Sequence, residues 1–72
     1  MEYPVDRNFK YHKPTEDQAS RYNHLRDKAK EYATMVLEFC PDSLERSLAL
    51  TKLEEAVMWA NASIARTEAK SE

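Results

Sequence analysis

The chain has 72 residues, of which 33% are charged, with a net charge of −2, one cysteine and no glycine. This length allows one small domain, and the lack of glycine excludes a phosphate-binding loop and a dinucleotide-binding fingerprint. Because one cysteine cannot form an internal disulfide and the two histidines lack zinc-ligand spacing, oligomerisation remains as the means of stabilising so small a core.

Two partner classes are disfavoured by charge and hydropathy. A binder of duplex DNA or RNA normally carries a basic excess, and this chain is slightly acidic. The charged N-terminus is not followed by a long apolar run, so we expect neither a signal peptide nor a membrane span. These features predict a cytosolic protein that does not bind membranes.

Residues 1–14 are predicted to form an extended or irregular N-terminal arm, because they contain Pro4 and Pro14 and no sustained periodicity. The first thirteen residues have a net charge of +1 and carry three aromatic rings, those of Tyr3, Phe9 and Tyr11. Rings beside cations suit a small anionic ligand that contains a base, since a ring stacks on the base and a cation binds a phosphate. The alternative is that the three rings only cover apolar surface.

The first long helix is predicted over residues 15–40. Thr15 and Gln18 form a capping box, and Glu16 and Asp17 favour the positive end of the helix dipole. An apolar seam follows at steps of three and four and comprises Tyr22, Leu25, Ala29, Tyr32, Val36 and Phe39. Pro41 ends this helix.

A basic cluster lies off this seam and comprises Arg21, His24, Arg26, Lys28 and Lys30. One interpretation is a solvated face with pairs four residues apart. The other is a phosphate site, for which Arg26 is the best candidate. It follows the seam residue Leu25, so its guanidinium could reach the rim of a subunit contact and bind phosphate oxygens bidentately.

The second long helix is predicted over residues 43–69, capped by Asp42, which has the capping-box spacing to Glu45, or by Ser43. It is apolar on two sides. One side comprises Ala49, Leu50, Leu53, Ala56, Val57, Ala60 and Ile64, and the other comprises Leu44, Leu48, Met58, Trp59, Ala62 and Ala65. One partner helix cannot cover both sides, so the second side predicts self-association.

The predicted fold class is therefore all-α. Residues 15–70 form an antiparallel helical hairpin with a tight connection, preceded by the arm, and several hairpins assemble into a homo-oligomeric helical bundle. Arg66 lies in the last apolar turn, where one interpretation is a partner for the negative end of the helix dipole.

Little in the sequence indicates catalysis. Cys40 has no histidine near it in sequence and is predicted to be a small core residue. Glu54 and Glu55 could meet their copies across an oligomer axis, but a carboxylate metal site normally recruits a Glu-x-x-His pair, and the second helix has no histidine. We expect a protein that is not an enzyme and has no metal or cofactor.

Two stretches resemble a known family. The first is YHKPTE at residues 11–16, and the second runs from ERSLALTKL at residues 45–53 to MWANASIAR at residues 58–66. Over roughly residues 9–66 the chain resembles the small phage helical-hairpin proteins that act as anti-CBASS and anti-Thoeris sponges. Those proteins bind cyclic nucleotide signals of bacterial immune systems without cleaving them.

This resemblance implies a homohexamer whose pockets between subunits enclose cyclic dinucleotides and, in some members, cyclic trinucleotides or cyclic ADP-ribose isomers. The family's base-stacking tyrosine matches Tyr11, beside His12 and Lys13 in the same motif. Its phosphate-binding lysine falls on Arg26, which keeps the charge and changes the geometry. A basic residue near the end of the family's second helix aligns close to Ala62, so this chain lacks it, and Arg66, one turn further on, is the candidate substitute.

The ligand-binding residues expected from these arguments are Tyr11, His12, Lys13, Arg26 and Arg66. The expected function is sequestration of a cyclic nucleotide in the cytoplasm of the infected host. The alternative is an oligomeric hairpin that binds a host or phage protein through its arm, with no small-molecule ligand.

Overall fold

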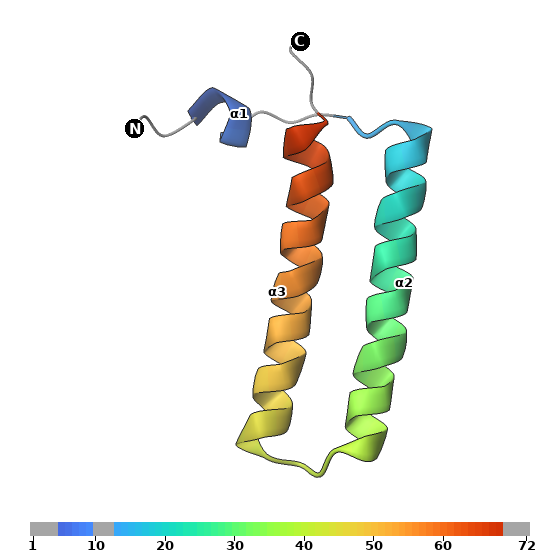
Figure 1. Cartoon of the computed structure of the whole chain (residues 1–72), viewed down its shortest axis with the longest axis vertical. Helices are drawn as coiled ribbons and strands as arrows, with labels where there is room; N and C mark the ends of the chain where they lie inside the picture. The colour runs from blue at the N-terminus through green and yellow to red at the C-terminus, as the bar shows by residue number, and fades with distance from the viewer. Residues whose placement is uncertain (1–4, 10–12, 69–72) are drawn as a thin grey trace.

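A computed structural model of the chain describes residues 5–9 and 13–68, and every regular element in these residues is helical. The helices are α1 (Val5–Phe9), α2 (Glu16–Phe39) and α3 (Leu44–Thr67). Helices α2 and α3 lie side by side and antiparallel, joined by a short connection at one end (Figure 1). The predicted helical hairpin is therefore confirmed. No described helix is both long and apolar enough to cross a bilayer.

The start of α2 is fixed by the predicted capping box. The Thr15 hydroxyl accepts a hydrogen bond from the Gln18 backbone N–H at 3.1 Å, and the Thr15 N–H donates to Gln18 Oε1 at 3.1 Å. These two bonds satisfy amide groups that a helix start otherwise leaves unpaired.

The connection between the helices is held by short-range polar contacts. Ser43, rather than Asp42, is the N-cap of α3, because its hydroxyl accepts from the Arg46 N–H at 3.1 Å. The Asp42 carboxylate instead pairs with the Arg46 guanidinium at 3.2 Å, and Arg46 also donates to the Cys40 carbonyl at 3.2 Å. One arginine thus links the end of α2 to the start of α3.

The core of a single hairpin is small. Val36 is the one buried hydrophobic residue of the described chain. Half-buried apolar side chains share its interface, namely Tyr22, Leu25, Ala29 and Ala33 of α2 and Leu50, Leu53, Val57, Ala60 and Ile64 of α3. The predicted seam is wrong at Tyr32 and Phe39, which are exposed, since the small Ala33 takes the inner position that Tyr32 was expected to hold. Cys40 is also exposed at the C-cap of α2, so its prediction as a core residue is wrong.

The arm is not wholly irregular. Helix α1 forms one turn in a segment that lacks glycine and proline and carries Asp6 in its first turn, where a carboxylate favours the helix dipole. Figure 1 shows α1 at the open end of the hairpin, the end where α2 begins and α3 ends. The expectation of an extended arm is therefore wrong for residues 5–9.

The side of α3 that faces away from α2 is apolar and uncovered. We call it the outer stripe, and its large members, each at least half exposed, are Leu44, Leu48, Met58 and Trp59. One hairpin alone therefore leaves much apolar surface in water.

Candidate functional site

Arg26 lies on the rim of a groove between the two long helices. The groove has a volume of about 530 Å³, and its other lining residues are Ala29, Lys30, Ala33 and Leu37 of α2 and Leu50, Leu53, Glu54 and Val57 of α3. Helix α2 places Arg26 here because it follows the inward-facing Leu25 by one residue, about 100° around the helix. An apolar floor with cationic side chains at the rim offers contacts to both a base and a phosphate.

The Arg26 guanidinium donates to the side-chain oxygen of Asn23. Asn23 is neutral and lies one turn earlier on the same helix, so this bond does not neutralise the positive charge of the guanidinium. A charge-assisted bond to a phosphate is roughly twice as strong as a bond between neutral groups. A bound anion can therefore displace Asn23 without breaking an ion pair.

Of the other candidates, Lys13 is described and Tyr11 and His12 lie outside the described residues. Lys13 is exposed and stands two residues before the Thr15 cap, at the open end of the hairpin. Its position on the chain places it beside the start of α2 rather than in the groove.

Arg66 lies in the last turn of α3 and is exposed. It lines a shallow depression of about 280 Å³ with Trp59, Ala62, Ser63 and Thr67. Ala62 and Arg66 are one turn apart and line the same depression, so a basic side chain at either position would serve the same surface. The Trp59 indole N–H points to the Glu55 carboxylate at 3.4 Å.

Arg26 and Arg66 are not brought together within one chain. Arg26 faces the groove between the helices, whereas Arg66 lies at the end of the outer stripe, on the far side of α3. A pocket that used both side chains would have to take them from two copies of the hairpin.

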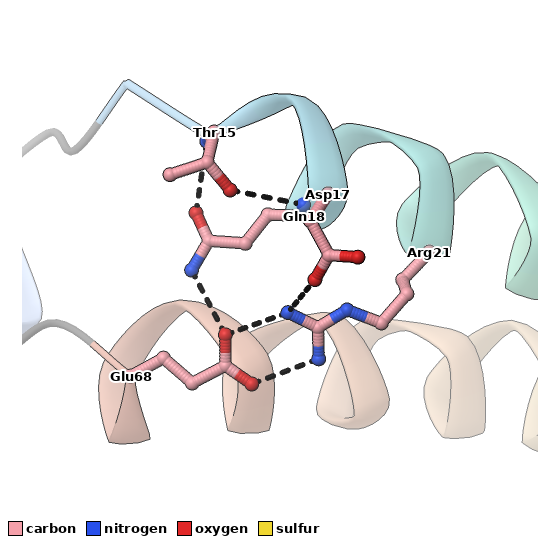
Figure 2. A network of polar contacts seen from close by, with 5 residues as sticks. All are labelled: Thr15, Asp17, Gln18, Arg21 and Glu68. Carbon is pink, nitrogen blue, oxygen red and sulfur yellow. Dashed lines mark hydrogen bonds and ion pairs between the residues drawn. The ribbon is translucent and has the colours of Figure 1, made fainter.

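Sequence reasoning missed a polar network at the open end (Figure 2). The Arg21 guanidinium forms two hydrogen bonds with the Glu68 carboxylate, at 2.8 and 2.7 Å, and an ion pair with Asp17 at 2.9 Å. Gln18 Nε2 donates to Glu68 at 3.1 Å. We call the group Asp17, Gln18, Arg21 and Glu68 the open-end clamp. The spacing of Asp17 and Arg21 was visible in the sequence, but Glu68 is 47 residues from Arg21 and no local pattern connects them.

The clamp also affects the pKa of Arg21. Its hydrogen bonds to Glu68 raise the pKa of the guanidinium above its ordinary value, and the nearby Asp17 carboxylate acts in the same direction. Because the pKa of Arg21 is higher in the folded than in the unfolded state, its stabilising effect is fully present below the unfolded-state pKa. It is lost only as the pH rises through the folded-state pKa. Arg21 therefore stays cationic throughout the physiological range.

The described residues offer little for catalysis. Among them no group of three His, Cys, Asp or Glu side chains could hold a metal ion. Glu54 and Glu55 have separate surroundings, because Glu54 lines the groove while Glu55 contacts Lys52 and Trp59. The arrangement offers cations, an apolar groove and hydrogen-bond donors, which are groups that can bind a ligand.

Comparison with known proteins yields one family match. Searches among curated proteins and solved structures return no match. The family described as the Acb2/Tad1 hairpin domain matches residues 1–65, which include the arm, all of α2 and most of α3. The chain therefore belongs to the Acb2/Tad1 hairpin family, the family of anti-CBASS and anti-Thoeris sponges.

Proposed function

We propose that this protein sequesters a cyclic nucleotide second messenger of bacterial immunity, without cleaving it, in the cytoplasm of a phage-infected cell. The ligand is a cyclic di- or trinucleotide or a cyclic ADP-ribose isomer. The observation that carries the proposal is the family match over residues 1–65, because it covers the arm, all of α2 and most of α3. A sponge needs no catalyst, only an affinity that keeps the free messenger below the level that activates its effector.

The proposed site is built at the contact between hairpins. Arg26 binds a phosphate at the groove rim, and Tyr11, His12 and Lys13 approach the ligand from the arm. Arg66 contributes from the end of an outer stripe on another copy, since one chain holds it away from Arg26. Burying the outer stripe and enclosing the ligand are then one event, which explains how so short a chain forms a pocket.

The proposed assembly is a homohexamer. The outer stripe supports assembly, because exposed apolar side chains on one side of α3 are the kind of surface that a second copy can cover. The count of six comes from the family.

Native mass spectrometry tests ligand and assembly together. The protein is measured alone and after incubation with cyclic dinucleotides, cyclic trinucleotides and cyclic ADP-ribose isomers. We expect a hexamer that gains intact ligand masses in a fixed ratio and releases the same masses after denaturation. A ligand mass altered by hydrolysis would contradict sequestration, and an oligomer that takes up nothing would favour a protein partner.

The phosphate role of Arg26 is tested by titration calorimetry with the ligand that mass spectrometry identifies. Removing a hydrogen bond to a charged group costs about 1.5–3 kcal/mol, so Arg26→Gln should weaken ligand affinity by about 10- to 100-fold. Lys28→Gln is the matched control, because it removes one cation from the same helix and Lys28 pairs with Glu31 at 3.5 Å, outside the groove. Equal affinities of the two variants in titration calorimetry would remove Arg26 from the site.

A further inference from the structure

The open-end clamp links the two long helices at the place where α2 begins and α3 ends. Arg21 and Glu68 meet through two parallel N–H to oxygen bonds, at 2.7 and 2.8 Å, and each side chain is 40% exposed. An isolated surface ion pair contributes little, but a bidentate arginine within a network of charges has a defined geometry. The clamp therefore determines where the two helix ends lie relative to each other.

Gln18 connects this clamp to the start of α2. Its Oε1 accepts from the Thr15 N–H and its Nε2 donates to Glu68, each at 3.1 Å (Figure 2). A single amide thus belongs to the capping box of α2 and to the C-cap of α3, since Glu68 is the C-cap residue. The side chain of Gln18 therefore connects the C-cap residue of α3 to Thr15.

The segments that the clamp joins are those that carry most of the candidate ligand residues. Only Pro14 separates the 11–13 segment from Thr15, and Glu68 follows Arg66 by two residues. Helix ends fray unless they are tied, and a binding residue on a frayed end must be ordered when the ligand binds. Ordering in advance removes that cost from the binding step.

The geometry of Arg21 also departs from what stability alone would favour. Its Nε is buried and has no hydrogen-bond partner, because the guanidinium contacts both carboxylates through its outer nitrogens. A buried unpaired donor is destabilising and calls for a local explanation. The end-on geometry offers one, since it lets a single guanidinium hold the carboxylates of both helices.

We propose that Glu68 is a positioning residue of the ligand site, which, through Gln18 and Arg21, holds the last turn of α3 and the base of the arm in their binding arrangement. Glu68 does not touch the ligand. This inference rests on the proposed function, and it adds to it a residue of the α3 C-cap that acts on affinity through preorganisation.

The test compares Glu68→Ala with Glu31→Ala. Glu31→Ala is the matched control because it removes the surface ion pair between Glu31 and Lys28. That pair lies within α2 and does not link two helices. Ligand affinity is measured by titration calorimetry, the assembly by native mass spectrometry, and local order by hydrogen exchange. We expect Glu68→Ala to weaken affinity about tenfold with an unchanged oligomer and helix content, and Glu31→Ala to stay within about twofold of the wild type.

A double-mutant cycle separates positioning from a general loss of stability. If Glu68 acts through Arg21, then Arg21→Gln combined with Glu68→Ala should weaken affinity no more than the worse single variant. Losses that add in full, or a Glu68→Ala variant with wild-type affinity, would overturn the positioning role while leaving the sponge intact. So would a loss of affinity that follows only from dissociation of the oligomer.

Hydrogen exchange without ligand keeps the inference separate from the proposed function. Glu68→Ala should accelerate exchange at the amides of residues 15–18 and 64–68 and leave the middle of both helices protected. Unchanged exchange at these ends would refute the clamp, even if the wild-type protein bound no cyclic nucleotide. Failure of the wild type to bind would refute the sponge, whatever the exchange data show.

Discussion

At the scale of single residues, the binding groups are few and their surroundings decide their roles. Arg26 has a neutral partner that an anion can displace, whereas the guanidinium of Arg21 is committed to two carboxylates. Both arginines belong to the same basic cluster in the sequence, and composition alone does not separate them. Partner identity makes Arg26 available for a ligand and Arg21 structural.

Replacement of Tyr11 by alanine and by phenylalanine distinguishes a stacking role of its ring from a hydrogen-bonding role of its hydroxyl. Tyr11→Ala should weaken ligand affinity by about 1–3 kcal/mol, since that is the contribution of one ring stacked on one base. The oligomer should be unchanged in native mass spectrometry. Tyr11→Phe keeps the ring and should retain most of the affinity. If Tyr11→Ala bound as tightly as the wild type in calorimetry, stacking by the arm would be wrong.

At the scale of elements, each long helix begins at a side-chain cap that the sequence shows. Thr15 and Gln18 were identified from the Thr-x-x-Gln spacing, and the structure confirms both bonds of the box. For α3 the sequence allowed Asp42 or Ser43, and the choice depended on Arg46. The Arg46 guanidinium pairs with Asp42, while its backbone N–H donates to Ser43.

Loss of the Ser43 cap should destabilise the hairpin. Its hydroxyl accepts from the Arg46 N–H and donates to the Pro41 carbonyl at 3.1 Å. Ser43→Ala should therefore lower the free energy of unfolding by about 1 kcal/mol, measured by urea denaturation at fixed protomer concentration. Ser47→Ala is the control, because it makes the same change inside the helix, where alanine is the better helix former. Equal stability of the two variants would contradict the capping role.

At the scale of the whole molecule, the two outer faces of the hairpin differ. The side of α2 opposite its interface carries exposed polar residues, namely Asp27, Glu31 and Thr34, and Tyr32, Met35, Leu37 and Phe39 are exposed elsewhere on this helix. The outer stripe of α3 is apolar and exposed. Large uncovered apolar surfaces mark sites of protein contact. We therefore predict that the outer stripe of α3 is a contact between copies of the hairpin.

A charge placed in the outer stripe should separate the subunits. The Met58 side chain is 53% exposed in one hairpin, and burial of a glutamate there without a partner is strongly unfavourable. Met58→Glu should shift the assembly to smaller species in sedimentation velocity, and ligand binding should fall with it. Thr34→Glu on the polar face of α2 should leave the assembly intact. An unchanged oligomer in Met58→Glu would place the contact elsewhere.

The sequence by itself determined the all-helical fold, the start of α2 and the excess of apolar surface, because capping and helical periodicity act between residues three or four apart. Only the tertiary structure decided which rings lie inside, and it put Ala33 at the interface and left Tyr32 and Phe39 in solvent. Only the tertiary structure showed the open-end clamp and the separation of Arg26 from Arg66. Both depend on how the second helix returns along the first, and this pairs residues that lie up to 50 positions apart in sequence.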